Sequence, residues 1–226
     1  DLDEAVAVAR LWDAIFAASR ADADDPVAAW AAHNAGLVAR RAMLNERRYA
    51  ALRFRGPGTD LVVGLADGDA WAGGVTTARN GATGNPNIPT EEVFTTPHAA
   101  KTQGTVTATK PLSYQGTLIR DIRVRFDGGV IVEASAGTGQ DVLQRMIDTD
   151  DGARRLGEVA LVPAANPIAQ TGILFLNTLF DENAASHIAL GQAYSKCFVD
   201  QDLTEAELAQ RGANRSLIHV DWMIGS

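Results

Sequence analysis

The spacing of the hydrophobic residues changes near residue 50, and this change constrains the fold more than any other feature. Up to that point, hydrophobic residues recur every three or four positions, as on one face of a helix. Beyond it, they alternate with polar residues, as in half-buried strands. The two patterns predict an α+β fold, in which a helical segment at residues 1–50 precedes a mostly antiparallel β region with inserted helices at residues 51–226.

Two helices are predicted within the first fifty residues. Asp1 and Glu4 resemble a capping box at the start of the first helix. The second helix is predicted to begin after Asp25, an N-cap residue, with Pro26 at the first helical position, where its missing N–H costs nothing. His33 lies near the apolar stripe of this helix and is interpreted as a structural histidine rather than a metal ligand. The stripe carries three large apolar residues, Trp30, Leu37 and Leu44.

The rest of the chain predicts strands with two helices inserted among them. Strands are predicted at residues 61–65, 122–126, 130–134, 157–163 and 216–224. Thr138 is the predicted N-cap of a short helix that ends near Ile147. The stretch DENAASHIALGQAY, residues 181–194, is predicted to be a helix that begins near Asp181 or Asn183.

Composition and charge exclude several classes of protein. With 226 residues, of which 46% are hydrophobic, the chain can bury a core as one large domain or two small ones. A net charge of -8 argues against a nucleic-acid-binding surface, which needs clustered Lys and Arg. Because there is no run of about 18 apolar residues and no signal-peptide pattern, we expect no membrane segment and a cytoplasmic location. The single cysteine, Cys197, excludes an internal disulfide and a four-thiolate zinc site.

Two of the predicted strands contain ionisable residues. Glu158 interrupts the apolar run LGEVALVP, where a buried charge is costly unless a partner neutralises it. His219 and Asp221 are two positions apart in the closing strand, so both point to one face of it. Val220 and Trp222 point to the other face. The closing strand is therefore predicted to have one packing face and one polar face.

Other ionisable residues accompany the remaining apolar segments. The predicted helix that begins near residue 181 places His187 and Tyr194 on one face, and Glu182 lies at its start. The conformationally restricted segment NPNIPT precedes Glu91 and Glu92. These two carboxylates point to opposite sides if the chain is extended there, so we expect only one of them to face inward.

At least two histidines and three or four carboxylates are thus predicted in apolar surroundings. Zinc, cobalt and manganese bind carboxylate oxygens and imidazole nitrogens, and five or more such ligands suit two ions bridged by a carboxylate and a water. No short metal-binding motif such as His-Glu-x-x-His is present. Spacing alone therefore leaves an alternative open, a salt-bridged core that uses arginines such as Arg120 or Arg123.

Five longer stretches resemble stretches that occur in the same order in a known protein family: GPGTDL, PNIPTEEVFTTP, LGEVALVP, NTLFDENAASHIALGQAY and HVDWMIGS. From about Trp30 to the last residue, the chain resembles the thermophilic aminopeptidase family of the aminopeptidase T, aminopeptidase S and PepS type. The resemblance implies a homodimeric metallopeptidase with two divalent ions, which are zinc, cobalt, manganese or magnesium. Because family members carry an α/β domain ahead of this region, it also implies that residues 1–226 are the single, C-terminal catalytic domain of a longer aminopeptidase.

The resemblance implies roles for individual residues. Tyr194 matches a tyrosine that sits at the metals, and Glu182 matches a further active-site carboxylate. Whether Glu91 shares the role of Glu92 stays open, and we favour Glu92. The implied metal ligands are Glu92, Glu158, His187, His219 and Asp221.

The predicted function is hydrolysis of the N-terminal peptide bond of peptides with a free N-terminus. In this hypothesis Glu92 bridges two ions, and a water between them is acidified toward hydroxide. Glu182 or Glu91 is the candidate proton shuttle to the leaving amine, and Tyr194 binds a metal or stabilises the oxyanion. Neither nucleic acid nor a membrane is an expected partner. Two alternatives are a non-catalytic binding or dimerisation module and a two-metal amidase that acts on another small amide.

Overall fold

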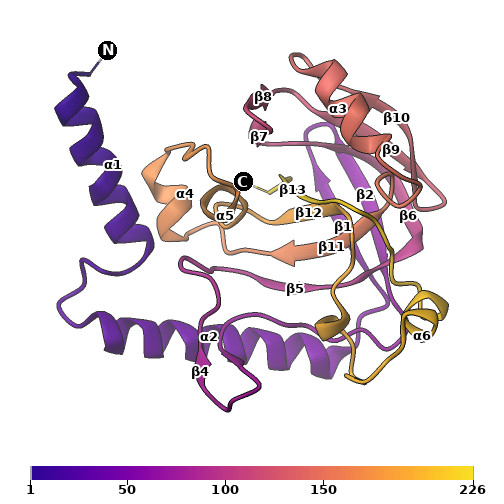
Figure 1. The fold of residues 1–226 in the computed structure, drawn as a ribbon, viewed down its shortest axis with the longest axis horizontal. Helices are drawn as coiled ribbons and strands as arrows, with labels where there is room; N and C mark the ends of the chain where they lie inside the picture. Colours follow the sequence, from indigo (N-terminus) through magenta and orange to yellow (C-terminus); the bar gives the residue numbers. More distant parts are fainter. Residues whose placement is uncertain (1, 226) are drawn as a thin grey trace.

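The structure, a computed structural model, describes residues 2–225. Figure 1 shows two N-terminal helices followed by a β-rich body that carries shorter helices. The helices are α1 (Glu4–Ala18), α2 (Pro26–Arg47), α3 (Gln140–Ile147), α4 (Pro167–Thr171), α5 (Thr178–Glu182) and α6 (Glu205–Gln210), with a 3-10 turn η1 (Ser195–Cys197). The predicted α+β class is confirmed.

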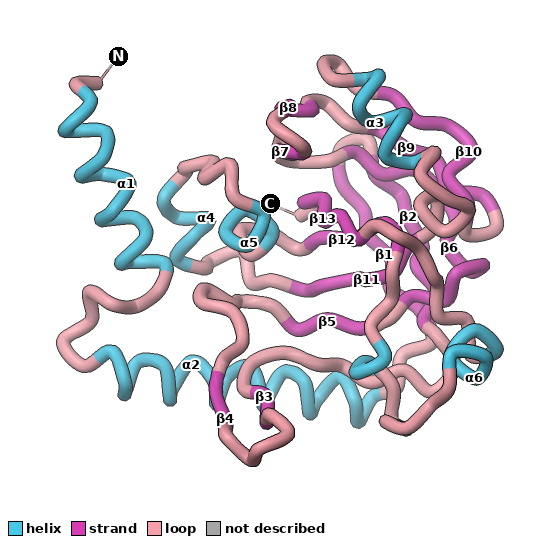
Figure 2. Tube along the Cα trace, viewed as in Figure 1, coloured by secondary structure: helices cyan, strands magenta, loops and turns pink. Residues whose placement is uncertain are grey.

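Two antiparallel sheets form the body of the molecule. The strands are β1 (Ala51–Gly56), β2 (Thr59–Leu65), β3 (Thr76–Thr77), β4 (Thr83–Gly84), β5 (Val93–Thr95), β6 (Pro97–Thr107), β7 (Leu112–Tyr114), β8 (Thr117–Ile119), β9 (Arg123–Asp127), β10 (Val130–Ser135), β11 (Leu156–Leu161), β12 (His187–Gly191) and β13 (His219–Met223). The five-stranded sheet has the order β1-β2-β6-β9-β10, and the four-stranded sheet has the order β13-β12-β11-β5. The strand pairs β3-β4 and β7-β8 stand apart from both sheets, and Figure 2 shows that the segment between β2 and β5 is otherwise mostly loop.

Both sheets contribute to one hydrophobic core. Val63 and Phe126 come from the five-stranded sheet, Ile188 and Trp222 come from the four-stranded sheet, and Leu143 comes from α3. All five are buried. Removing such side chains from water is the main favourable term in folding. One face of the four-stranded sheet therefore packs in the hydrophobic core. Only its opposite face is left to carry functional side chains.

Helix α2 lies along the β5 edge of the four-stranded sheet (Figures 1 and 2). It begins as predicted, because the Asp25 carboxylate accepts a hydrogen bond from the N–H of Ala28 and Pro26 occupies the first position. Leu37 and Leu44 are buried, whereas Trp30 is half-buried. The helix thus joins the core beside the strand that carries Glu92 at its start.

Two predicted helix caps are wrong. The predicted cap residue Asp1 lies outside the described residues. The N-cap of α1 is Asp3, whose carboxylate accepts a hydrogen bond from the N–H of Ala5. The N-cap of α3 is Gly139, which adopts a left-handed conformation and provides no side-chain cap. Thr138 fails as a cap because its hydroxyl donates to the carbonyl of Leu118 instead.

The predicted helix at residues 181–194 is also wrong. Helix α5 ends at Glu182, and the segment from His187 to Gly191 is the strand β12. All five residues of β12 are buried, because β12 lies between β11 and β13 and both of its faces are covered. A strand buried on both faces shows no alternation of polar and apolar residues, so its sequence cannot be told from that of a buried helix.

No helix among residues 2–225 is both long enough and apolar enough to cross a membrane.

Candidate metal centre

The five predicted metal ligands lie on one face of the four-stranded sheet: four of them come from β11, β12 and β13, and Glu92 immediately precedes β5. In an antiparallel sheet, residues that are directly opposite each other share a face. Ala189 of β12 is opposite both Glu158 of β11 and Asp221 of β13. The remaining ligands follow the same rule: His187 is opposite Ala160, His219 is opposite Gly191, and Glu92 lies two residues before Phe94, which is opposite Ala160.

Small residues stand between the ligands on this face. Ala160 and Ala189 are fully buried and offer only a methyl group each. Gly191 has a φ of 101°, and a side chain there would collide with the carbonyl of Ile218. The ligands therefore surround a shallow floor that leaves room for ions.

The ligand atoms form two overlapping groups. Glu92, Glu158 and His187 offer atoms that all lie within 4.8 Å of one another, and so do Glu158, His219 and Asp221. In the first group, the Nε2 atom of His187 lies 2.9 Å from Oε2 of Glu92 and 3.6 Å from Oε1 of Glu158. In the second, the Nε2 atom of His219 lies 3.9 Å from Oε2 of Glu158 and 3.6 Å from Oδ1 of Asp221. Glu158 thus belongs to both groups, with one oxygen toward each histidine.

Backbone carbonyls fix the orientation of both histidines. The Nδ1 atom of His187 lies 3.0 Å from the carbonyl of Ala185, and that of His219 lies 2.8 Å from the carbonyl of Gln192. A carbonyl can only accept, so Nδ1 carries the hydrogen in each ring. The Nε2 atoms then point toward the carboxylates, in the arrangement typical of histidines that bind metals.

The buried polar atoms fit divalent cations. Oε2 of Glu92 and Nε2 of His187 are buried and lie close together, yet neither makes a hydrogen bond of acceptable geometry. A buried polar atom without a partner is costly, and a cation between these atoms would satisfy both. Among residues 2–225, no ion pair links the five ligands to an arginine or a lysine. The alternative of a core neutralised by arginines such as Arg120 or Arg123 is therefore not supported.

The clustered charges shift the pKa values of several groups. Burial, with the nearby Glu92 and Asp221 carboxylates, raises the pKa of Glu158 to about 7. Burial lowers the pKa of His219, but the nearby Asp221 carboxylate outweighs this effect and the pKa rises to about 9. Burial also disfavours a charge on His187, but the nearby Glu158, Glu92 and Asp221 carboxylates outweigh it and its pKa rises well above the ordinary value. Without cations, the site therefore holds protons in their place.

Glu182 and Tyr194 line the same cleft as the ligands. This cleft has a volume of about 530 Å³ and also contains Glu92, Glu158 and Asp221. Burial, followed by repulsion from Asp221 and Glu92, raises the pKa of Glu182 to about 9. Tyr194 is partly exposed, and its ring centroid lies 4.6 Å from that of His219. Both residues are thus placed where a ligand in the cleft would meet them.

A profile of the family described as thermophilic metalloprotease (M29) matches residues 1–226. The chain belongs to this family.

Several proteins of known name resemble the chain over its whole length. It is 58% identical to aminopeptidase T of Thermus aquaticus and 49% identical to aminopeptidase 2 of Geobacillus stearothermophilus, and it covers 55% of each of these proteins. The solved structure of wild-type AmpT from Thermus thermophilus matches with a TM-score of 0.92 at 56% identity, over 100% of this chain and 54% of that one. The chain thus spans about half the length of the relatives that it matches. At 16% identity and a TM-score of 0.53, 2,5-dihydroxypyridine dioxygenase from Pseudomonas putida shares the fold alone.

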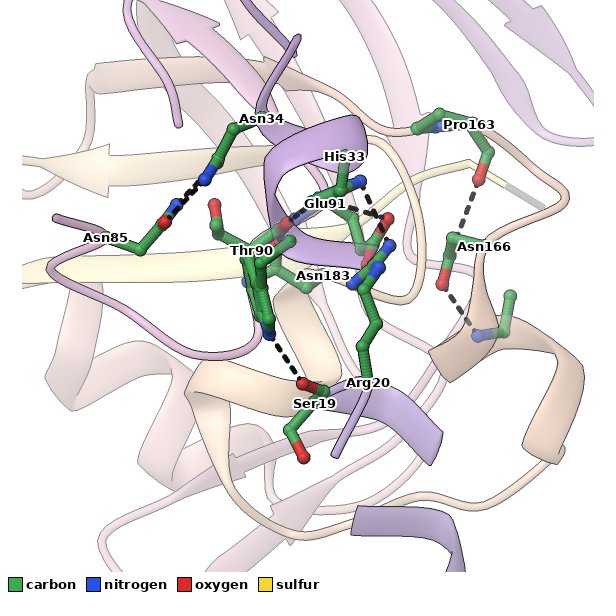
Figure 3. Close-up of polar contacts among 12 residues, drawn as sticks. Ser19, Arg20, His33, Asn34, Asn85, Thr90, Glu91, Pro163, Asn166 and Asn183 are labelled. Atoms are coloured by element: carbon green, nitrogen blue, oxygen red, sulfur yellow. Dashed lines mark hydrogen bonds and ion pairs between the residues drawn. The ribbon is translucent and has the colours of Figure 1, made fainter. Parts of the chain in front are cut away.

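Membership of the M29 family implies a divalent metal, and the two ligand groups are the candidates for holding it. The structure does not bring Glu91 into these groups. The carboxylate of Glu91 instead lies 2.7 Å from the guanidinium of Arg20 (Figure 3). Both neighbouring glutamates are buried, so the expectation that only one of them faces inward is wrong; Glu92 lies with the other ligands, whereas Glu91 lies against Arg20. A catalytic role for Glu91 stays a prediction.

The contacts around Glu91 are not apparent from the sequence. Arg20, His33 and Asn183 all contact the segment that carries it. The interpretation of His33 as a structural histidine is confirmed, since its ring lies in hydrogen-bonding distance of Arg20 and of the carbonyl of Thr90. No sequence signal identified Arg20, because it lies in the turn between α1 and α2 and its partner is distant in the sequence.

Proposed function

We propose that this chain is the metal-binding, catalytic part of a longer aminopeptidase of the M29 family. The observation that supports the proposal most is that Glu158 belongs to both ligand groups. Two adjoining groups that share one carboxylate match what a pair of divalent cations requires. In this proposal Glu158, rather than Glu92 as expected from the sequence, would be the residue that helps to hold both cations. Residues 1–50 supply the helical segment, and residues 51–226 supply the β-rich part that binds the metals.

The residues present divide between two cation positions. Glu92 and His187 would hold one cation, His219 and Asp221 the other, and Glu158 both. When bound, zinc, cobalt, manganese or magnesium would acidify a water molecule and polarise a peptide carbonyl. The buried setting of the ligands keeps the number of competing water molecules small, which strengthens every electrostatic interaction in the site.

Glu182 and Tyr194 provide further chemistry in the cleft. In the metal-free structure, burial and repulsion from Asp221 and Glu92 raise the pKa of Glu182 to about 9. A carboxylic acid in this cleft can donate a proton to a leaving amine, which is the role we assign to it. The hydroxyl of Tyr194 can donate a hydrogen bond to an oxygen on the substrate. In this proposal, the free α-amino group of the substrate would dock near one cation or an acidic side chain of the cleft.

The peptide substrates, a homodimeric full-length protein and a cytoplasmic location are parts of the same proposal. They are motivated by the similarity to aminopeptidases that this chain covers only in part. A non-catalytic module is less well supported, because among residues 2–225 no arginine or lysine pairs with the carboxylates of this cluster.

Metal content and substrate choice test the proposal. We expect elemental analysis of the full-length protein to find about two equivalents of divalent metal per chain. We also expect it to hydrolyse an aminoacyl chromogenic amide but not the same amide with an acetylated amino group. Hydrolysis of both amides at similar rates would favour the amidase alternative, and absence of both metal and hydrolysis would favour the non-catalytic module.

A further inference from the structure

A buried polar cluster lies beside the metal centre but outside it (Figure 3). At its heart, the guanidinium of Arg20 and the carboxylate of Glu91 lie 2.7 Å apart, with side chains that are 15% and 3% exposed. Arg20 belongs to the turn after α1, whereas Glu91 immediately precedes the metal ligand Glu92. The pair thus connects the N-terminal helices to the start of β5.

The turn between α1 and α2 holds Arg20 in place. Its guanidinium carbon lies 5.2 Å from the ring centroid of Trp30, within the range of a cation–π interaction. The indole N–H of Trp30 in turn donates to the carbonyl of Ser19, at 2.8 Å. Arg20 is therefore an ordered group rather than a long flexible side chain.

His33 links Arg20 to the backbone of Thr90. Arginine has no acceptor atom, so Arg20 donates to Nδ1 of His33 across 3.0 Å. The hydrogen of the neutral ring must then sit on Nε2, which donates to the carbonyl of Thr90 across 2.6 Å. This assignment agrees with the burial of His33, which lowers its pKa and favours the neutral ring.

Asn183 holds the same segment from the opposite side. Its side-chain oxygen accepts a hydrogen bond from the backbone N–H of Glu91, at 2.7 Å, and its amide donates to the carbonyl of Leu179, at 2.9 Å. Asn183 is fully buried and directly follows Glu182. The backbone before Glu92 is thus attached both to α2 and to the end of α5.

We propose that Arg20, His33 and Asn183 are positioning residues that hold Thr90 and Glu91 so that the next residue, Glu92, faces the metal centre. Successive side chains of an extended chain point to opposite sides, so anchoring Glu91 on one side directs Glu92 to the other. The inference rests on the proposed metal binding. It makes the N-terminal helices a support for one of the two cation positions.

The test uses cobalt binding by the full-length protein. Four variants are compared with the unaltered protein: Arg20→Met, Glu91→Gln, the double variant Arg20→Met/Glu91→Gln, and Asn183→Ala. Arg125→Met is the matched control, because Arg125 pairs with Glu133 on the five-stranded sheet. Cobalt affinity is measured by competition with a chromophoric chelator, the ligand geometry by the visible spectrum of bound cobalt, and the stability of each metal-free protein by denaturant unfolding.

We expect Arg20→Met and Asn183→Ala to weaken cobalt binding roughly 10–100-fold, as for other residues that support a metal ligand. Glu91→Gln should bind nearly as well as the unaltered protein, because the glutamine side chain can keep the same position against the guanidinium of Arg20. The control should not differ from the unaltered protein.

The double variant separates positioning from stability. It leaves no buried charge without a partner, so its metal-free stability should recover relative to Arg20→Met, while its cobalt affinity and spectrum stay altered. Full recovery of affinity together with stability would overturn the inference. If the unaltered protein binds no cobalt at all, the proposed function itself fails. If it binds cobalt and Arg20→Met binds equally well, only this inference fails.

Discussion

The two large sheets place their charged residues in opposite ways. On the five-stranded sheet, Arg125 and Glu133 are opposite each other on neighbouring strands and form an exposed ion pair. On the four-stranded sheet, Glu158 and Asp221 flank the same residue of β12, and both are buried. The first arrangement pairs opposite charges across strands, as sheets commonly do. The second gathers like charges, which only a protonated or metal-bound state can neutralise.

The pKa values reflect the same contrast. A hydrogen bond from Arg125 lowers the pKa of Glu133, whereas burial raises that of Glu158 to about 7. An arginine beside a carboxylate favours its ionised form, whereas burial among other carboxylates disfavours that form. Location in an exposed cross-strand pair therefore indicates a structural role, and location in a buried like-charged group indicates a functional one.

The largest effect is expected from His187→Ala. The imidazole of His187 lies in the first ligand group, so its loss should remove a cation and lower kcat/KM for an aminoacyl chromogenic amide. The decrease should exceed about 100-fold, because residues that merely support a ligand already cost 10–100-fold. Steady-state kinetics and metal analysis of the variant measure this. A kcat/KM close to that of the unaltered protein would show that the reaction does not use this ligand group.

The floor of the site gives the next prediction. In Ala189→Leu, the added carbon atoms would occupy the space between Glu158 and Asp221, both opposite this residue. Metal stoichiometry should fall, and overpacking should cost about 1–3 kcal/mol of stability. Elemental analysis and denaturant unfolding measure the two effects. Ala51→Leu is the control, because Ala51 is exposed on the five-stranded sheet. Normal metal content in Ala189→Leu would contradict the interpretation that Ala189 lies beneath the cation positions.

The pH dependence of the free energy of unfolding tests the buried carboxylates of the four-stranded sheet without any substrate. The pKa of Glu158 is raised from its ordinary value of 4.5 to about 7 in the folded protein. Between these values the folded state binds more protons than the unfolded chain, so the free energy of unfolding falls as pH rises through this interval. In the metal-free protein, Glu158→Gln should therefore raise stability at pH 8 by on the order of 2 kcal/mol, and should change it little at pH 4. Denaturant midpoints at the two pH values measure this, and a variant less stable at pH 8 would refute the reasoning.

The smallest effect is expected from Arg125→Ala. This side chain is solvent-exposed in its pair with Glu133, and such pairs contribute little to stability because water screens them. We expect no measurable change in the denaturant midpoint, in metal content or in kcat/KM. A large loss of metal in this variant would erase the distinction between the two sheets.

The sequence predicted the parts of the site where local alternation is visible. His219 and Asp221 alternate with Val220 and Trp222, and β13 has the predicted polar and packing faces. Strand β12 was predicted as a helix, because both of its faces are buried and its residues do not alternate. His187 nevertheless lies beside Glu92 and Glu158. Its role as a ligand was implied by the family resemblance rather than by the helical geometry assumed for it, and stays a prediction.

The meeting of the five ligands could not be derived from spacing. It depends on the strand order β13-β12-β11-β5, which brings together segments that are far apart in the chain. It also depends on a register irregularity between Leu156 and Glu158, which sets the face on which Glu158 emerges. The contact between Arg20 and Glu91 could not be predicted from the sequence for the same reason, because it links a turn near the N-terminus to a loop beside β5.

The distribution of the proposed ligands over β11, β12, β13 and the residue before β5 has a consequence for assembly. Because side chains alternate between faces, a slip of one residue in any of these strands would send its ligand into the hydrophobic core and bring an apolar side chain to the centre. In the proposed site, metal binding would therefore depend on correct strand register: a chain with misaligned strands could bury almost as much apolar surface, yet it could not bring the ligands together.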